Sequence, residues 1–268
     1  MRGKLNISIL STLLFTSSSM AQAWWEKKPY QEWSVREVDR MLNDSPWVAI
    51  TPLHLPRQSA FPLNLRFLLL TARPIREGYL RRLSFPANVQ KGPDFENTIP
   101  VDQAKARDKA EESQARLKRF MSANQGDIRV RGDERHIVIA VALSQFVPPS
   151  ASRWAIDTEG RQIRTEISQS PWIEEPRPEF LMGSKLSDWV GRTYVTTNLG
   201  KRAEVVRYDP PGLDLLGAKF YFSRRTPDGK ILIGDGDDEL RFETRIGGKQ
   251  VRVKFDLKKM KYKGKLET

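Results

Sequence analysis

The chain has 268 residues, with 45 lysines and arginines, 33 aspartates and glutamates, two histidines and no cysteine, and a formal net charge of +12. The missing cysteines exclude disulfides, thiolate metal sites and a cysteine nucleophile. The sequence also has no H-E-x-x-H, G-x-S-x-G or S-x-x-K motif. It therefore gives no indication of a zinc or serine hydrolase, and we expect no cofactor.

Residues 1–23 have the features of a secretory signal peptide. Two basic residues precede a short apolar run, and Ala21-Gln22-Ala23 is typical of a signal cleavage site. No apolar stretch reaches the ~20 residues that cross a bilayer, so we expect no transmembrane segment after cleavage. The mature chain would begin at Trp24 and lie in the periplasm or outside the cell.

Export limits the partners that the positive charge can meet. An exported protein seldom encounters nucleic acid, so an acidic envelope polymer or an anionic lipid surface is the expected counter-charge. The alternative is a solvated basic surface with no particular partner. The sequence does not indicate a protein partner.

Residues 24–48 form a tryptophan-rich segment that should contain a helix. Ser34-Val35-Arg36-Glu37 matches the S-x-x-E capping box, and Trp33 precedes it at the position of a hydrophobic staple with Val38. Large aromatic side chains can hold a chain end that would otherwise fray. We therefore expect Trp24 and Trp25 to tether this end, with stacking on a sugar ring as the alternative.

In residues 49–146, the sequence predicts a strand, two helices and a second strand, in that order. Leu65, Phe67 and Leu69 alternate in a buried strand that leads into a helix begun by Pro74. A second helix is expected over 103–123, and a second apolar strand over 136–146. If the two strands were parallel, they would require a right-handed crossover.

Residues 147–192 are a Pro-containing, irregular connection with short strands expected near 154–156 and 162–167. Residues 193–268 predict an antiparallel β-meander of three hairpins, turning at 198–201, 227–229 and 247–248. The expected fold is α+β, a largely antiparallel sheet with N-terminal helices packed on one face.

The last predicted hairpin has one polar, basic face. Val251, Val253 and Phe255 alternate with outward residues. The outward and following cations Arg252, Lys254 and Lys258 are our candidate binding residues for an anionic partner. Such lysines and arginines can also serve only to prevent edge-to-edge association of sheets.

The acidic stretch 234–239 holds the best metal candidates, Asp235, Asp237 and Glu239. Oxygen ligands at alternate positions suit calcium, but the EF-hand pattern fails. An acidic turn between two strands is the preferred interpretation, so no metal site is expected. Of the histidines, His136 begins a strand and His54 lies in a proline-flanked loop.

Several segments resemble an uncharacterised family of exported bacterial proteins that is grouped beside proteins with a GWxTD motif. They are WEKKPYQEWSVREVDRMLNDSPW, LLLTARPIREGYLRRL, GAKFYFSR and VRVKFDLKKMKYKGKLE. The Gly-Trp-x-Thr-Asp motif itself is absent. The resemblance implies export and carries no activity or site residues over to this chain.

These observations together predict a non-enzymatic envelope protein with a binding or scaffolding role. The alternative is a carboxylate-based hydrolase of an envelope polysaccharide, with Glu174, Glu175 or Glu179 as one of its acids. A cleft with two facing carboxylates would favour the hydrolase, and a flat basic face would favour binding.

Overall fold

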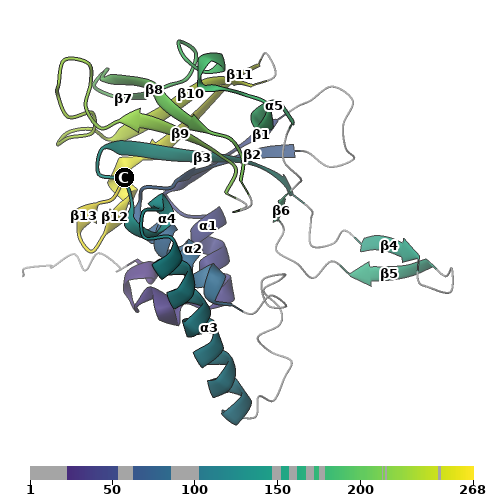
Figure 1. Ribbon diagram of the computed structural model, residues 1–268. Coiled ribbons are helices and arrows are strands. Elements are labelled where there is room, and N and C mark those ends of the chain that lie inside the picture. The colour runs from purple at the N-terminus through teal and green to yellow at the C-terminus, as the bar shows by residue number, and fades with distance from the viewer. Residues whose placement is uncertain are drawn as a thin grey trace, which may run out of the picture.

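The computed structural model describes residues 23–53, 63–85, 103–146, 152–156, 162–166, 172–174, 179–212, 214, 216–246 and 249–268 (Figure 1). Apart from Ala23, the expected signal peptide lies outside the described residues, as do His54, Glu175 and the 247–248 turn. None of the described helices is long and apolar enough to cross a bilayer.

One antiparallel sheet organises the molecule. Its strands follow the order β1 (Val48–Leu53), β2 (Leu63–Leu69), β3 (His136–Phe146), β9 (Ala218–Ser223), β8 (Arg202–Asp209), β7 (Tyr194–Thr197), β10 (Glu239–Ile246) and β11 (Lys249–Asp256), with β6 (Trp172–Glu174) paired to the end of β3. The α+β class with a largely antiparallel sheet is thereby confirmed. Strands β4 (Ser152–Ile156) and β5 (Gln162–Glu166) pair with each other, where short strands were expected.

The sheet curls until its two end strands, β1 and β11, contact each other. Aromatic side chains fill the space that this curvature encloses. The ring centroids of Phe67 on β2 and Phe242 on β10 are 5.3 Å apart, although these strands are not neighbours in the sheet. Phe220 and Phe222 on β9 also contact Phe242, and all four side chains are fully buried. The core is therefore the interior of a nearly closed barrel.

Two of the expected strand connections differ in the structure. Strands β2 and β3 pair directly and antiparallel, with Leu68 opposite Ala140, so no crossover is needed. Strand β9 has β3 and β8 on its two edges, and the segment after it therefore cannot pair with it as a hairpin partner. That segment does turn at 227–229, as predicted, but it forms an isolated bridge from Arg225 to Ile231 and no strand. The β7–β8 turn at 198–201 and the register of β10 with β11 agree with the prediction.

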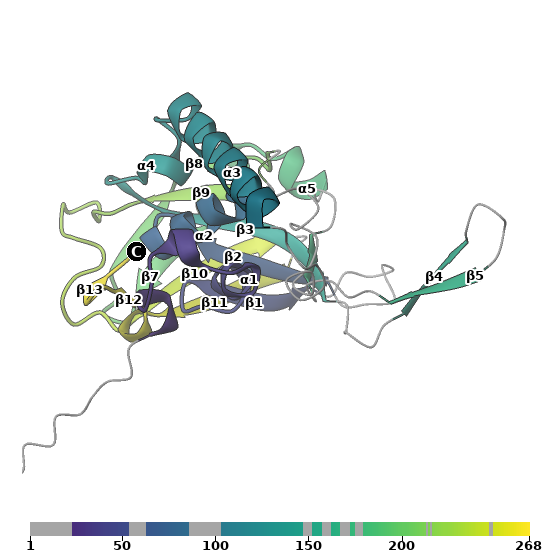
Figure 2. The ribbon, with the colours of Figure 1, turned by 90° about the horizontal axis from the view of Figure 1, so that it is seen from below.

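The helices α1 (Val35–Asn43), α2 (Arg73–Ser84), α3 (Gln103–Ala123) and α4 (Ile128–Arg131) lie together on one side of the sheet (Figures 1 and 2). Helices α1 and α2 approach closely at Gly78, where a Cβ atom would lie 3.1 Å from the Met41 side chain. Beneath them, the fully buried Arg66 of β2 donates a hydrogen bond to Asn43 at 2.6 Å. Figure 1 shows helix α3 extending away from the sheet.

The tryptophan-rich segment is held as expected. Ser34 and Glu37 form the capping box of α1, with bonds of 3.3 and 2.7 Å to each other's backbone amides. The rings of four tryptophans form a continuous series. Their centroids are 5.5 Å apart for Trp24 and Trp25, 5.7 Å for Trp24 and Trp33, and 5.4 Å for Trp25 and Trp47. Trp33 and Trp47 are fully buried, and the other two pack against the core.

The C-terminal residues complete this arrangement. After η5 (Leu257–Lys259), strands β12 (Lys261–Tyr262) and β13 (Lys265–Leu266) make a small hairpin. Trp47 donates from Nε1 to the backbone oxygen of Glu267 at 2.8 Å, and the Tyr262 hydroxyl donates to Glu77 on α2 at 2.6 Å. The two ends of the described chain therefore stabilise each other. The remaining short elements are η1 (Trp24–Glu26), η2 (Tyr30–Glu32), α5 (Glu179–Met182) and η4 (Leu186–Asp188).

Candidate functional site

The outward-pointing residues of β8, β7, β10 and β11 form a continuous charged surface, here called the outer face. Val195, Leu240 and Val253 represent the alternate positions that point into the core. The residues between them point outward, and directly opposite residues share the same side of a sheet. The outer face comprises Arg202, Glu204, Tyr194, Thr196, Glu239, Arg241, Glu243, Arg245, Gln250, Arg252, Lys254 and Asp256.

The structure brings two of the three predicted binding residues to this face. Arg252 and Lys254 lie on β11, and Lys258 follows the strand in η5. Each of the three has a carboxylate partner: Arg252 with Glu243 at 2.8 Å, Lys254 with Glu239 at 3.0 Å, and Lys258 with Asp238 at 2.8 Å.

These three cations remain accessible in spite of their partners. Their side chains are 54, 60 and 68% exposed, in the order Arg252, Lys254 and Lys258. Exposed ion pairs contribute little free energy, because water screens them and ordering the side chains costs entropy. The pairs therefore lower the local positive field without fixing the cations in place.

A hollow of about 400 Å³ opens at the end of the outer face, where β7 begins and β10 ends. Its lining residues are Gly191, Arg192, Tyr194, Glu243, Thr244, Arg245 and Gln250. Sequence reasoning did not identify this hollow. The alternation along β10 would have placed Arg245 outward, but no sequence signal relates it to Arg192, which precedes β7.

Glu243 is the carboxylate that lines this hollow, and three neighbouring side chains donate hydrogen bonds to it. It accepts hydrogen bonds from Tyr194 at 3.1 Å and Gln250 at 3.3 Å, besides its ion pair with Arg252. Burial by itself raises the pKa of Glu243, but the bonds from Arg252 and Tyr194 outweigh it and hold the pKa below its ordinary value. Glu243 is therefore ionised at neutral pH.

The acidic turn does not gather its carboxylates around one point. Asp237 binds Lys201 at 2.7 Å and accepts from the Gly234 amide at 2.8 Å. Glu239 pairs with Arg241 and Lys254 on the outer face, while Asp235 is exposed. Within the described ranges, no group of three metal-ligating side chains occurs.

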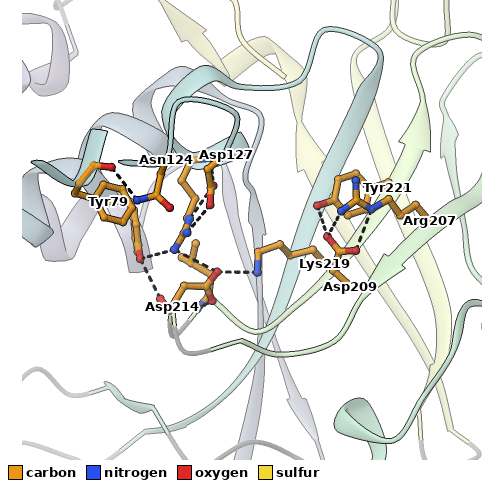
Figure 3. Close-up of polar contacts among 11 residues, drawn as sticks. Tyr79, Asn124, Asp127, Arg207, Asp209, Asp214, Lys219 and Tyr221 are labelled. Carbon is orange, nitrogen blue, oxygen red and sulfur yellow. Dashed lines mark hydrogen bonds and ion pairs between the residues drawn. The ribbon is translucent and has the colours of Figure 1, made fainter. Parts of the chain in front are cut away.

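A second charged region, here called the polar cluster, lies between the helices and the sheet (Figure 3). Its residues come from α2, from α4 and its N-cap, from β8 and β9, and from the loop that joins β8 to β9. They are Tyr79, Asp127, Arg129, Arg207, Asp209, Asp214, Lys219 and Tyr221. Several of them, together with Asp133, line a hollow of about 260 Å³. Figure 3 shows that the aspartates and cations point toward one another, so the charges of the cluster are mutually paired.

Each aspartate of this region has its own basic partner. Asp127 binds Arg129, and Asp214 binds Lys219 at 2.7 Å. Asp209 holds Arg207 at 2.8 Å and accepts a bond from the Tyr221 hydroxyl at 2.6 Å. Asp133 is paired with His136, the histidine that begins β3, at 2.9 Å.

These pairings set the protonation of the carboxylates. Burial by itself raises the pKa of Asp127, but hydrogen bonds from Arg129 outweigh it and leave the pKa below the ordinary aspartate value. At Asp133, burial likewise opposes the hydrogen bond from His136, and the pKa is again lowered. Both groups are ionised at neutral pH, whereas a general acid needs a raised pKa.

Comparison with protein-family models, with curated proteins and with solved structures finds no match to this chain. The resemblance to an exported bacterial family therefore stays a prediction.

Proposed function

We propose that the chain is exported, loses residues 1–23 and acts in the cell envelope as a non-enzymatic binding or scaffolding protein. Its ligand is an acidic envelope polymer or an anionic lipid surface, held on the outer face. The observation that carries this proposal is the placement of accessible cations from β8, β10 and β11 on one side of the sheet.

The form of the outer face suits an extended anionic ligand better than a compact one. Neighbouring strands lie about 4.8 Å apart, so the cations of the adjoining strands β10 and β11 form rows that a polymer can follow, and β8, beyond β7, adds Arg202. An exposed ion pair is worth only about 0–1 kcal/mol, and anionic groups of a ligand can replace the internal carboxylate partners at small cost. Binding of this kind is the sum of several weak contacts and depends on salt.

The polar cluster gives less support to the alternative, a carboxylate-based hydrolase. Such an enzyme requires one carboxylic acid that keeps its proton and a second carboxylate about 5–10 Å away. Asp127 and Asp133 both have lowered pKa values and a basic partner, which suits neither group as the acid. Of the glutamates considered from sequence, Glu174 lies in β6 and Glu179 begins α5.

Export can be tested separately from binding. Amino-terminal sequencing of the protein recovered from the cell envelope should begin at Trp24. Recovery of uncleaved protein from the cytoplasm, with Met1 still in place, would contradict the proposed location.

The binding proposal is tested by retention of the mature protein on an anionic cell-wall polymer and on anionic vesicles. The outer-face variant changes Arg252 and Lys254, together with Lys258 just after β11, to glutamine, and it should show reduced retention on the polymer. The control changes three exposed cations outside the outer face, Lys118, Arg119 and Arg135, to glutamine, which removes the same charge.

The control should bind as the parent does, because it leaves the outer face intact. Equal losses in both triple variants would show that only net charge matters. Unchanged binding in the outer-face variant would show that this surface only keeps the protein soluble.

A further inference from the structure

The hollow at the end of the outer face holds two cations that the ion pairs of that face do not neutralise. Arg202, Arg241, Arg252 and Lys254 each have a carboxylate partner. Within the part of the chain that the structure describes, Arg192 and Arg245 have none, and both side chains are exposed. The positive field of the outer face is therefore concentrated at the hollow.

Arg192 is already restrained before any ligand arrives. Its guanidinium lies 5.2 Å from the ring centre of Trp189, a cation–π contact with a buried side chain. Its backbone amide also donates to the Trp189 oxygen at 3.2 Å. A cation that is held in place loses less conformational entropy on binding, which favours affinity.

The hollow also contains an acceptor, because Glu243 lies two residues before Arg245 on β10. Glu243 is fixed there by Tyr194, Gln250 and Arg252 and is ionised. A bare anion would gain from the arginines but would be repelled by this carboxylate. A ligand with hydroxyl groups beside its anionic group can bind both the arginines and Glu243, because hydroxyls donate to carboxylate and amide oxygens.

We propose that this hollow binds one acidic sugar residue, whose carboxylate oxygens accept hydrogen bonds from Arg192 and Arg245. Guanidinium groups bind such oxygens in a paired geometry that lysine cannot reproduce. The volume of about 400 Å³ lies in the lower part of the range for small-molecule sites, roughly 300–1,000 Å³, and suits one sugar ring. Sugar hydroxyls then face Glu243 and Gln250.

This inference rests on the proposed function and makes it more specific. The outer face would hold an acidic polysaccharide along its length, and the hollow would select for a sugar that carries the charge. A polyanion without sugar hydroxyls would bind the outer face and leave the hollow unused.

The test is a titration of the mature protein with glucuronate, glucose or inorganic phosphate, followed by NMR of backbone amides and by calorimetry. Glucuronate should shift the amide signals of Gly191, Tyr194 and Gln250, with glucose and phosphate far weaker. Changing both arginines to glutamine should weaken glucuronate binding by about tenfold or more. A control with Arg119 and Arg135 changed to glutamine should bind as the parent does.

The outcomes separate the two proposals. If glucuronate shifts no signals at the hollow, or binds the double arginine variant as well as the parent, the hollow is not an acidic-sugar site. If phosphate binds as tightly as glucuronate and depends on the same arginines, the preference for a sugar is wrong. The proposed function survives either result as long as the parent is retained on the anionic polymer and the outer-face variant is not. It fails if the parent itself is not retained.

Discussion

Gly217 occupies the point where the loop after β8 meets β9, and an alanine there should be among the most damaging small substitutions in the chain. Its φ of +86° is a conformation that L-residues seldom adopt. A Cβ atom would also lie 2.1 Å from the backbone oxygen of Val141 and 2.8 Å from Cα of Ala142, both on β3. Backbone atoms of a central strand cannot turn aside as a flexible side chain can.

The magnitude follows from these two contributions. The left-handed conformation costs an alanine about 1–2 kcal/mol. Displacing the loop from β3 costs about a further 1–3 kcal/mol, the usual range for overpacking. We therefore expect Gly217→Ala to lower the free energy of unfolding by about 2–5 kcal/mol. The same displacement would move Asp214 away from Lys219 and disturb the polar cluster.

Two other glycines provide matched controls. Gly200 has a φ of +78° but open space around its Cα, so Gly200→Ala should show only the conformational cost of about 1–2 kcal/mol. Gly126 has open space and no positive φ, so alanine there should be neutral or slightly stabilising. Urea unfolding followed by circular dichroism measures all three. Equal midpoints for Gly217→Ala and Gly200→Ala would refute the close approach to β3.

The remaining predictions concern the N-terminal segment and the polar cluster. Trp33→Ala should lower the free energy of unfolding by about 3–5 kcal/mol because its ring is fully buried, and Ser34→Ala by about 1 kcal/mol through loss of the cap, as measured by denaturant midpoints. Unchanged midpoints in both variants would reopen the sugar-stacking role of the tryptophans. Because the folded-state pKa of Asp127 is lowered, its pairing with Arg129 stabilises the protein above the ordinary aspartate pKa of about 4 and is lost as the pH falls through the lower folded value. Acid titration of stability should therefore be shallower for Asp127→Asn than for the parent, and identical slopes would show that the pair does not contribute.

The local features of this fold were predictable from sequence because their determinants are close together in the chain. The capping box needs only Ser34 and Glu37, three residues apart. The alternation on either side of the 247–248 turn determined the register of β10 with β11, and hence the outward position of Arg252. Helix α3 begins and ends where its polar, charged sequence indicated.

The order of the strands was not predictable by the same reasoning, because it depends on contacts between distant residues. Strand β3 pairs with β2 on one edge, and β9 can pair with its other edge only if the helical segment between β2 and β3 leaves that edge uncovered. Strand β1 was missed because Pro52 interrupts its pattern, and a proline fits there only near the edge of a sheet. The hollow joins Arg192 to Arg245 across more than fifty residues, and no periodicity relates them.

The central claim is that the outer face binds an acidic polymer through accessible charges. The most direct test is the affinity of the mature protein for an anionic polysaccharide and for an uncharged polysaccharide of similar length, each measured from low to moderate salt. We expect binding to the anionic polymer alone, with an affinity that falls steeply as the screening length shortens toward about 8 Å at physiological ionic strength. Equal binding to both polymers, or an affinity independent of salt, would contradict it.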